Sequence, residues 1–192
     1  MSEGEPVVVE ATRRRLSAKQ ADTVDRLTKA AVQVLTREGF AGMTIRMVAA
    51  EAGVGTATAY TYFSSKEHLV AEIFWRRLVA APSPASSDPD ATHRVVAELR
   101  EIAMLVADDQ AVSGAVTSAM LGRDPDVAHL RARIGAEIRT RIERALGPDP
   151  DPAVVVSLEL VYAGALVRAG MGYASYEDIA DLIEKSALLI LR

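Results

Sequence analysis

Small side chains and hydroxyl groups alternate over the eight residues from Gly55 to Tyr62. Threonine hydroxyls can hydrogen-bond to several bases, and threonine and alanine methyl groups can contact the methyl group of thymine. The major groove of DNA is wide enough to hold one helix with such a face. If this segment is helical, we expect Thr56, Ala57 and Thr61 to face the base edges.

The residues before this segment predict the elements that would position it. Thr44 can cap a short helix over 45–51, in which apolar residues recur at spacings of three and four. Gly53 follows directly, where a residue that tolerates positive φ lets the chain turn sharply. A second short helix then fits residues 56–62, so the sequence predicts a helix-turn-helix unit.

Three further residues are candidates for contacts with DNA phosphates. Thr44 and Lys66 lie at predicted helix N-termini, where backbone N–H groups and the helix dipole favour an anion. Arg46 would project from the first short helix toward the same DNA backbone. An ion pair of Arg46 with Glu51 or Glu38 is the structural alternative.

Flanking patterns predict a helix on each side of this unit. Ser17 and Gln20 form a capping-box pattern that would start a helix over 18–38, and Ser64 and Glu67 would start another that reaches residue 80. Together they suggest a DNA-binding domain over 17–63 and a connecting helix over 64–80.

Charge is distributed unevenly along the 192 residues, whose net charge is −4. Residues 11–80 contain 11 Lys and Arg against 6 acids, whereas the residues from 81 onward contain 11 against 17. We therefore expect the front of the chain to meet nucleic acid and the back to have another role. The tail 1–16 is expected to be flexible and basic, with Arg13, Arg14 and Arg15 either tracking DNA or simply solvated.

The back half reads as a second helical domain. Proline, serine and aspartate fill the segment 81–90, which we interpret as a linker before a domain over 91–192. Capping acids before proline predict helix starts at Asp124-Pro125 and Asp151-Pro152, and Ser175 with Asp178 predicts the last helix. Five helices fit this half, and with no comparable strand signal the chain is expected to be all-α.

The helix-turn-helix resembles the N-terminal motif of the TetR family of bacterial transcriptional regulators. The resemblance covers residues 17 to about 72 and is carried by Glu38-Gly39-Phe40, Thr44-Ile45-Arg46, Ala52-Gly53-Val54, Tyr60-Thr61-Tyr62-Phe63 and Ser65-Lys66-Glu67. It implies three DNA-binding helices, a fourth linking helix, and a C-terminal domain that dimerises and binds a small molecule. It also implies that the hydroxyls of Thr58, Tyr60 and Tyr62 contact phosphates. One departure is Gly55-Thr56-Ala57, where family members often have Ser-Lys-Gly.

An effector cavity is expected among helices five to eight, because ligand pockets are apolar with a few polar groups. The candidate lining residues are Met104, Met120, Leu121, Tyr162, Arg168 and Met171. Methionine adapts to irregular shapes, and an arginine on an apolar helix can meet a carboxylate. The alternative is that these residues are ordinary core or, for Arg168, a surface side chain.

The last two helices are the expected interface of a homodimer, which would present two reading helices to a palindromic operator in double-stranded DNA. Small residues that permit close approach and apolar residues that supply area are Gly164, Ala165, Ala169, Gly170, Leu182, Leu189 and Ile190. An internal core is the alternative.

Other functional classes find little support. The chain has no cysteine, and its three histidines form no HExxH or Glu-x-x-His pattern, so we expect no metal, no cofactor and no enzyme. The N-terminus lacks a signal-peptide pattern, and the longest apolar stretch, 154–167, is short for a membrane span, so we expect a cytoplasmic protein. The sequence predicts a ligand-responsive repressor, and the alternative is a helical ligand-binding or protein-interaction module that does not bind DNA.

Overall fold

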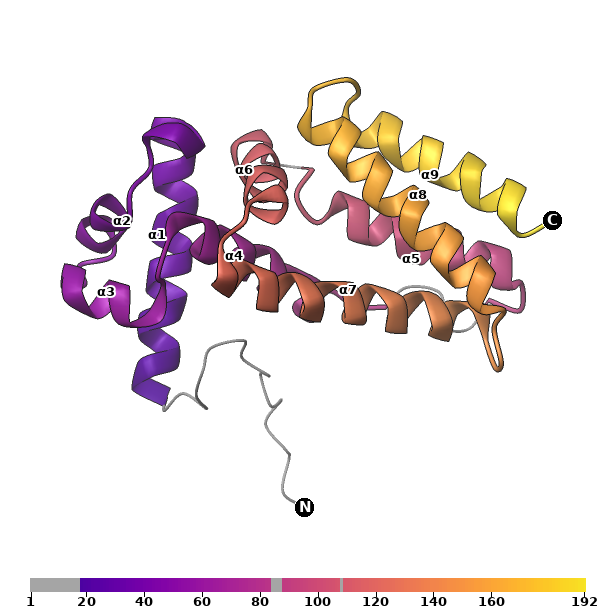
Figure 1. Cartoon of the computed structure of the whole chain (residues 1–192), viewed down its shortest axis with the longest axis horizontal. Coiled ribbons are helices and arrows are strands. Elements are labelled where there is room, and N and C mark those ends of the chain that lie inside the picture. Colours follow the sequence, from indigo (N-terminus) through magenta and orange to yellow (C-terminus); the bar gives the residue numbers. More distant parts are fainter. Residues whose placement is uncertain (1–17, 84–87, 108) are drawn as a thin grey trace, which may run out of the picture.

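The computed structural model describes residues 18–83, 88–107 and 109–192. Over these residues the chain forms helices and no strand (Figure 1). The helices are α1 (Ala18–Gly42), α2 (Ile45–Glu51), α3 (Thr56–Tyr62), α4 (Lys66–Ala80), α5 (Ala91–Met104), α6 (Gln110–Leu121), α7 (Pro125–Leu146), α8 (Pro152–Gly170) and α9 (Tyr176–Ile190). The prediction of an all-α fold is confirmed.

Local capping signals explain most of the helix boundaries. Asp124 and Asp151 cap α7 and α8 ahead of a first-turn proline, and Ser175 with Asp178 forms the capping box of α9. The helical dihedrals of α1 break at Gly39, which has φ of 66°, next to the predicted end at residue 38. Ser17, expected to cap α1, lies outside the described residues.

The prediction that Ser64 caps α4 is wrong by one residue. The Ser65 Oγ accepts the bond from the His68 N–H at 3.0 Å, as an N-cap does. The Ser64 Oγ instead donates to the Asp126 carboxylate at 2.6 Å, at the start of α7. Ser64 matches the capping-box spacing with Glu67, but Ser65 is the residue that caps the helix, since serine suits an N-cap without a capping box.

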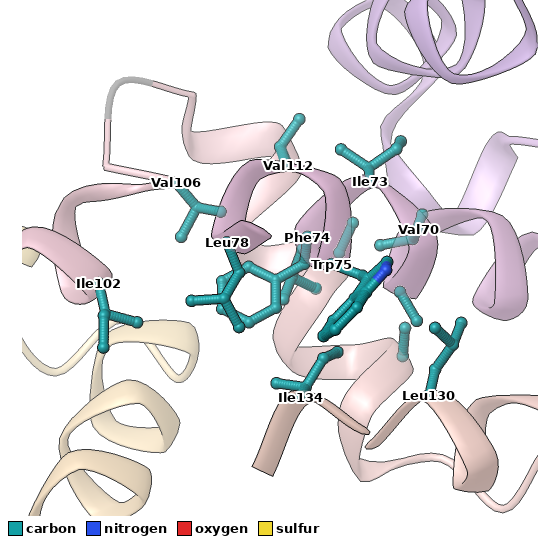
Figure 2. Close-up of a cluster of buried hydrophobic side chains, with 14 of the residues drawn as sticks. Val70, Ile73, Phe74, Trp75, Leu78, Ile102, Val106, Val112, Leu130 and Ile134 are labelled. Carbon is teal, nitrogen blue, oxygen red and sulfur yellow. The ribbon is translucent and has the colours of Figure 1, made fainter. Parts of the chain in front are cut away.

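Helix α4 connects the two halves of the molecule (Figure 1). It packs against α6 and α7 and also meets α1. Figure 2 shows Phe74, Trp75 and Leu78 of α4 within a buried cluster that includes Ile102 and Ile134 from the C-terminal half. A helix that is apolar on most of its surface belongs in a core, so a displacement of α4 would be felt by both halves.

A buried charge cluster fixes the far end of α4. Arg141 of α7 lies 3.0 Å from the Glu98 carboxylate of α5, and both side chains are almost fully buried. The Arg141 guanidinium also donates to the carbonyls of Leu78 at 2.6 Å and Ala81 at 3.0 Å. One arginine thus ties α7 to α5 and to the carbonyls at the C-terminal end of α4.

Helix α8 is unusually apolar for its exposure. Over the described residues it is the one helix long and hydrophobic enough to cross a membrane, by length and composition alone, and 22% of its tested window is buried. Glu159 in the middle of α8 forms a two-bond ion pair with Arg139 of α7, with distances of 3.1 and 2.6 Å. This ion pair holds α8 against α7, so the exposed apolar surface of α8 lies on a helix that is packed within the protein.

Candidate nucleic-acid interface and effector cavity

Helix α3 presents nearly all of its side chains to solvent. Only Ala59 is buried, while Ala57, Thr58, Tyr60 and Thr61 are exposed and Thr56 is half-buried. Tyr60, a candidate core aromatic by residue type, keeps 53% of its surface exposed. The face predicted to read DNA is thus open, on the side of α1 away from the C-terminal helices (Figure 1).

Tyr62 and Phe63 anchor the end of α3. Phe63 is fully buried, and its ring meets the His68 ring edge to face at a centroid distance of 5.5 Å. Tyr62 is half-buried and packs against the core. Phe63 is therefore a core residue, whereas Tyr62 combines packing with partial exposure.

The turn between α2 and α3 is stabilised by a residue of α1 that was not predicted from the sequence. Gly53 adopts φ of 62°, as expected of the turn glycine. Arg26 of α1 donates through Nη2 to the carbonyls of Ala52 at 2.6 Å and Gly53 at 3.0 Å. These carbonyls follow α2 and carry partial negative charge, which a cation stabilises. No local pattern relates Arg26 to a turn 26 residues away.

Arg46 is exposed at the start of α2, and no ion pair or hydrogen bond of its side chain is found among the described residues. The alternative that Arg46 pairs with Glu51 or Glu38 is wrong. Arg37 takes both carboxylates, at 3.0 Å for Glu51 and 3.1 Å for Glu38. Arg46 is therefore left available for an external anion.

Thr44 and Lys66, the two predicted N-terminal phosphate contacts, differ in the structure. The Thr44 Oγ1 accepts the Met47 N–H at 3.2 Å and stays exposed. The Lys66 ammonium donates to the carbonyls of Phe40 at 2.8 Å and Ala41 at 3.2 Å and lies over the Phe40 ring. The Lys66 side chain thus caps α1, because its cation meets the negative end of that helix, and its ammonium is engaged there rather than open to a phosphate.

Arg13, Arg14 and Arg15, the predicted arm, lie outside the described residues. The same holds for the rest of the tail 1–16.

A cavity of about 300 Å³ lies between α4, α6, α7 and α8. Three of the predicted lining residues, Met120, Leu121 and Tyr162, are part of its wall, together with Phe74 of α4 and Ile134 of α7. The expectation that α5 contributes is not met, since α4 takes its place.

The other three predicted lining residues lie elsewhere. Met171 is 61% exposed beyond the end of α8, and Arg168 is exposed with its guanidinium over the Tyr173 ring. Met104 ends α5 and is absent from the cavity wall. Because apolar residues cover most of the α8 circumference, its periodicity did not show which face meets the cavity.

The residues predicted for a dimer interface divide into two groups. Ala165 and Ala169 are buried within the monomer, and Gly170 faces Thr117 of α6 so closely that a Cβ would overlap the threonine side chain. Those small residues therefore serve internal packing, as the alternative had it. Gly164, Leu182 and Leu189 are exposed and Ile190 is half-buried, so these four remain candidates for an interface.

The comparisons with known proteins agree with this geometry. A sequence model of bacterial regulatory proteins of the tetR family matches residues 27–73. The chain is 43% identical over 175 residues to an uncharacterized HTH-type transcriptional regulator of Mycobacterium tuberculosis, covering 90% of this chain and 82% of that protein. The chain belongs to the TetR family.

Two further comparisons place this TetR-family member. It is 25% identical over 182 residues to the HTH-type transcriptional repressor KstR of Rhodococcus jostii, covering 91% of this chain and 85% of the repressor. A TetR transcriptional regulator from Rhodococcus sp. RHA1 has the same fold, with a TM-score of 0.73 and 22% identity over 91% of this chain and 98% of that one. The protein is thus a transcriptional regulator and not an enzyme.

Proposed function

We propose that this TetR-family member is a cytoplasmic homodimeric repressor that binds a palindromic operator through α3 and releases it when a small molecule occupies the cavity. The observation that carries the proposal is the exposure of α3. A helix with one buried residue and four exposed small or hydroxyl-bearing residues is built to meet another surface.

The roles of individual residues follow from their exposure. Ala57 and Thr61 face base edges, with Gly55 and Thr56 allowing close approach at the start of α3. Thr44, Thr58, Tyr60 and Tyr62 offer hydroxyls, and Arg46 a guanidinium, to phosphates that set the register of the protein on DNA.

The apolar surface of α8 and α9 supports dimerisation. Its exposed members include Val156, Leu160, Leu182, Leu188 and Leu189, of which Leu160 keeps 68% of its surface exposed. Contiguous apolar patches on soluble proteins mark interaction sites. A two-fold axis through this face would present two α3 helices, which fit successive major grooves when about 34–36 Å, or a multiple, apart.

Repression and release are supported by the similarity to the repressor KstR and by the cavity under α4. A molecule that binds better to a conformation with misplaced α3 helices weakens DNA binding. By thermodynamic linkage, the factor by which it weakens DNA binding equals the factor by which DNA weakens binding of the molecule. Because α4 lines the cavity and also contacts α1, it is the element that we propose carries the coupling.

Selection of genomic DNA fragments by the purified protein tests DNA binding directly. Thr58→Ala and Tyr62→Phe each remove one hydroxyl. At one fixed salt concentration, each variant is expected to bind the selected fragments about 2- to 10-fold more weakly than the parent does. Tyr173→Phe, at an exposed tyrosine beyond α8, is the matched control and is expected to bind as the parent does. Retention of no fragment even at low salt would favour a helical ligand-binding module without DNA binding.

A further inference from the structure

The cavity wall is apolar apart from a few groups, two of which lack partners. The Tyr162 hydroxyl and the Arg131 Nε are both buried, and neither has a hydrogen-bond partner among the described residues. Buried donors in folded proteins are nearly always hydrogen-bonded. Both residues line the same cavity, so a polar group bound there is the partner that we consider for them.

Tyr162 keeps its proton at physiological pH and can therefore donate a hydrogen bond. Burial raises the pKa of its hydroxyl far above the ordinary value, and the nearby Tyr176 raises it further. Its side chain is 3% exposed, so bulk water does not satisfy it. An acceptor bound in the cavity would satisfy this hydroxyl.

Arg131 adds a positive charge without a carboxylate partner. Its Nη2 donates to the Gly122 carbonyl at 2.8 Å, and no ion pair of Arg131 is found in the part of the chain that the structure describes. The carboxylate on the cavity wall, Glu159, is held by both bonds from Arg139. A half-buried cation on an apolar cavity favours an anionic occupant.

The cavity volume limits the size of that occupant. At about 300 Å³ the cavity lies at the small end of the range of ligand pockets, which is about 300–1,000 Å³. A compact hydrophobic acid suits a cavity of this size.

We propose that the effector is a compact apolar carboxylic acid, whose carboxylate accepts from the Tyr162 hydroxyl and the Arg131 Nε while its hydrocarbon part fills the cavity. This inference rests on the proposed ligand response and names the ligand class. The apolar wall supplies affinity, and the two donors select the head group.

Calorimetry with the full chain and three eight-carbon probes tests the class without DNA. Octanoate, 1-octanol and octylamine share a tail and differ in head charge. Octanoate is expected to bind at least about 10-fold more tightly than octanol, and octylamine not measurably. Equal binding of octanoate and octanol, or absence of octanoate binding, overturns the proposal.

Two variants test which residues bind the carboxylate of the ligand. Arg131→Gln is expected to weaken octanoate about 10- to 100-fold and to abolish its advantage over octanol. Because this change also removes the bond to Gly122, Tyr162→Phe is the second variant, with an expected loss of about 3- to 10-fold for octanoate. Arg144→Gln, an exposed arginine on α7, is the matched control. If both variants bind octanoate as the parent does, the assignment of the donors is wrong.

A gel shift with a selected operator separates this inference from the proposed function. Octanoate that binds but leaves the DNA complex intact upholds the ligand class and contradicts release. A neutral or steroid-sized compound that releases DNA while octanoate fails to bind upholds release and overturns the ligand class.

Discussion

Replacing Arg141 by methionine removes the centre of the buried charge cluster at the end of α4. The change takes away the bond to Glu98, the bond to Glu137 and the two bonds to the carbonyls of Leu78 and Ala81. Glu98, which is 1% exposed, keeps the Ser83 hydroxyl at 2.5 Å as a hydrogen-bond donor but loses its cation. A carboxylate is then left buried without an opposite charge.

The expected cost is large because the remaining charge is desolvated. Removing one partner of a buried pair costs about 3–5 kcal/mol. For a protein of 150–250 residues, each kcal/mol lowers Tm by about 2–4 °C, so Arg141→Met is expected to lower it by roughly 6–20 °C. Because a dimer makes Tm depend on concentration, all variants are compared at one concentration.

Unfolding in urea measures this loss through circular dichroism and the fluorescence of Trp75, the single tryptophan. The double variant Arg141→Met with Glu98→Leu is expected to regain much of the loss, since an apolar pair of similar volume avoids the buried charge. Arg144→Met, at an exposed arginine on α7, is expected to change the free energy of unfolding by less than about 0.5 kcal/mol. A loss below about 1 kcal/mol for Arg141→Met, or a double variant no more stable than it, would refute the reasoning.

Three further expectations concern the turn, the interface and a helix cap. Gly53→Ala is expected to lower the free energy of unfolding in urea by on the order of 1–2 kcal/mol, because φ is 62° and the added Cβ would lie 3.3 Å from the Arg26 guanidinium. The control Gly114→Ala in α6, which has open space around it, should not lower the stability. Leu160→Glu is expected to convert a dimer to a helical monomer in sedimentation, and a parent that is already monomeric contradicts the interface. Hydrogen bonds from its capping box lower the pKa of Asp178, so its stabilisation is present above the ordinary value of 3.8 and lost as pH falls through the lowered folded-state pKa. Asp178→Ala should therefore be less stable than the parent at pH 7 and equal to it in strong acid, and a gap that persists in acid argues against the cap.

Helix boundaries could be predicted wherever the signal lies within a few residues. Thr44, Asp124, Asp151 and Ser175 cap the helices that their neighbours predict. The exposed face of α3 also followed from its residue types, since only Ala59 is buried. The signal failed where two adjacent serines are both suitable N-caps, because the capping-box spacing favoured Ser64 whereas Ser65 caps α4.

Partners for long side chains could not be predicted in the same way. Lys66 binds the carbonyl of Phe40, 26 residues away, and Arg37 binds the carboxylate of Glu51, 14 residues away. The arrangement of helices brings the end of α1 to Lys66 and the carboxylate of Glu51 to Arg37, which leaves Arg46 open. Such pairings depend on helix packing and not on spacing along the chain.

The sequence by itself determined the all-helical fold, the helix-turn-helix and its family, because capping, turn geometry and periodicity are properties of neighbouring residues. The tertiary structure alone decided which face of α8 lines the cavity and which remains exposed, because that helix is apolar around most of its surface. It also decided that Arg131 and Tyr162 meet at one cavity. Those two residues come from separate helices, and only the packing of α7 and α8 makes both of them part of one cavity wall.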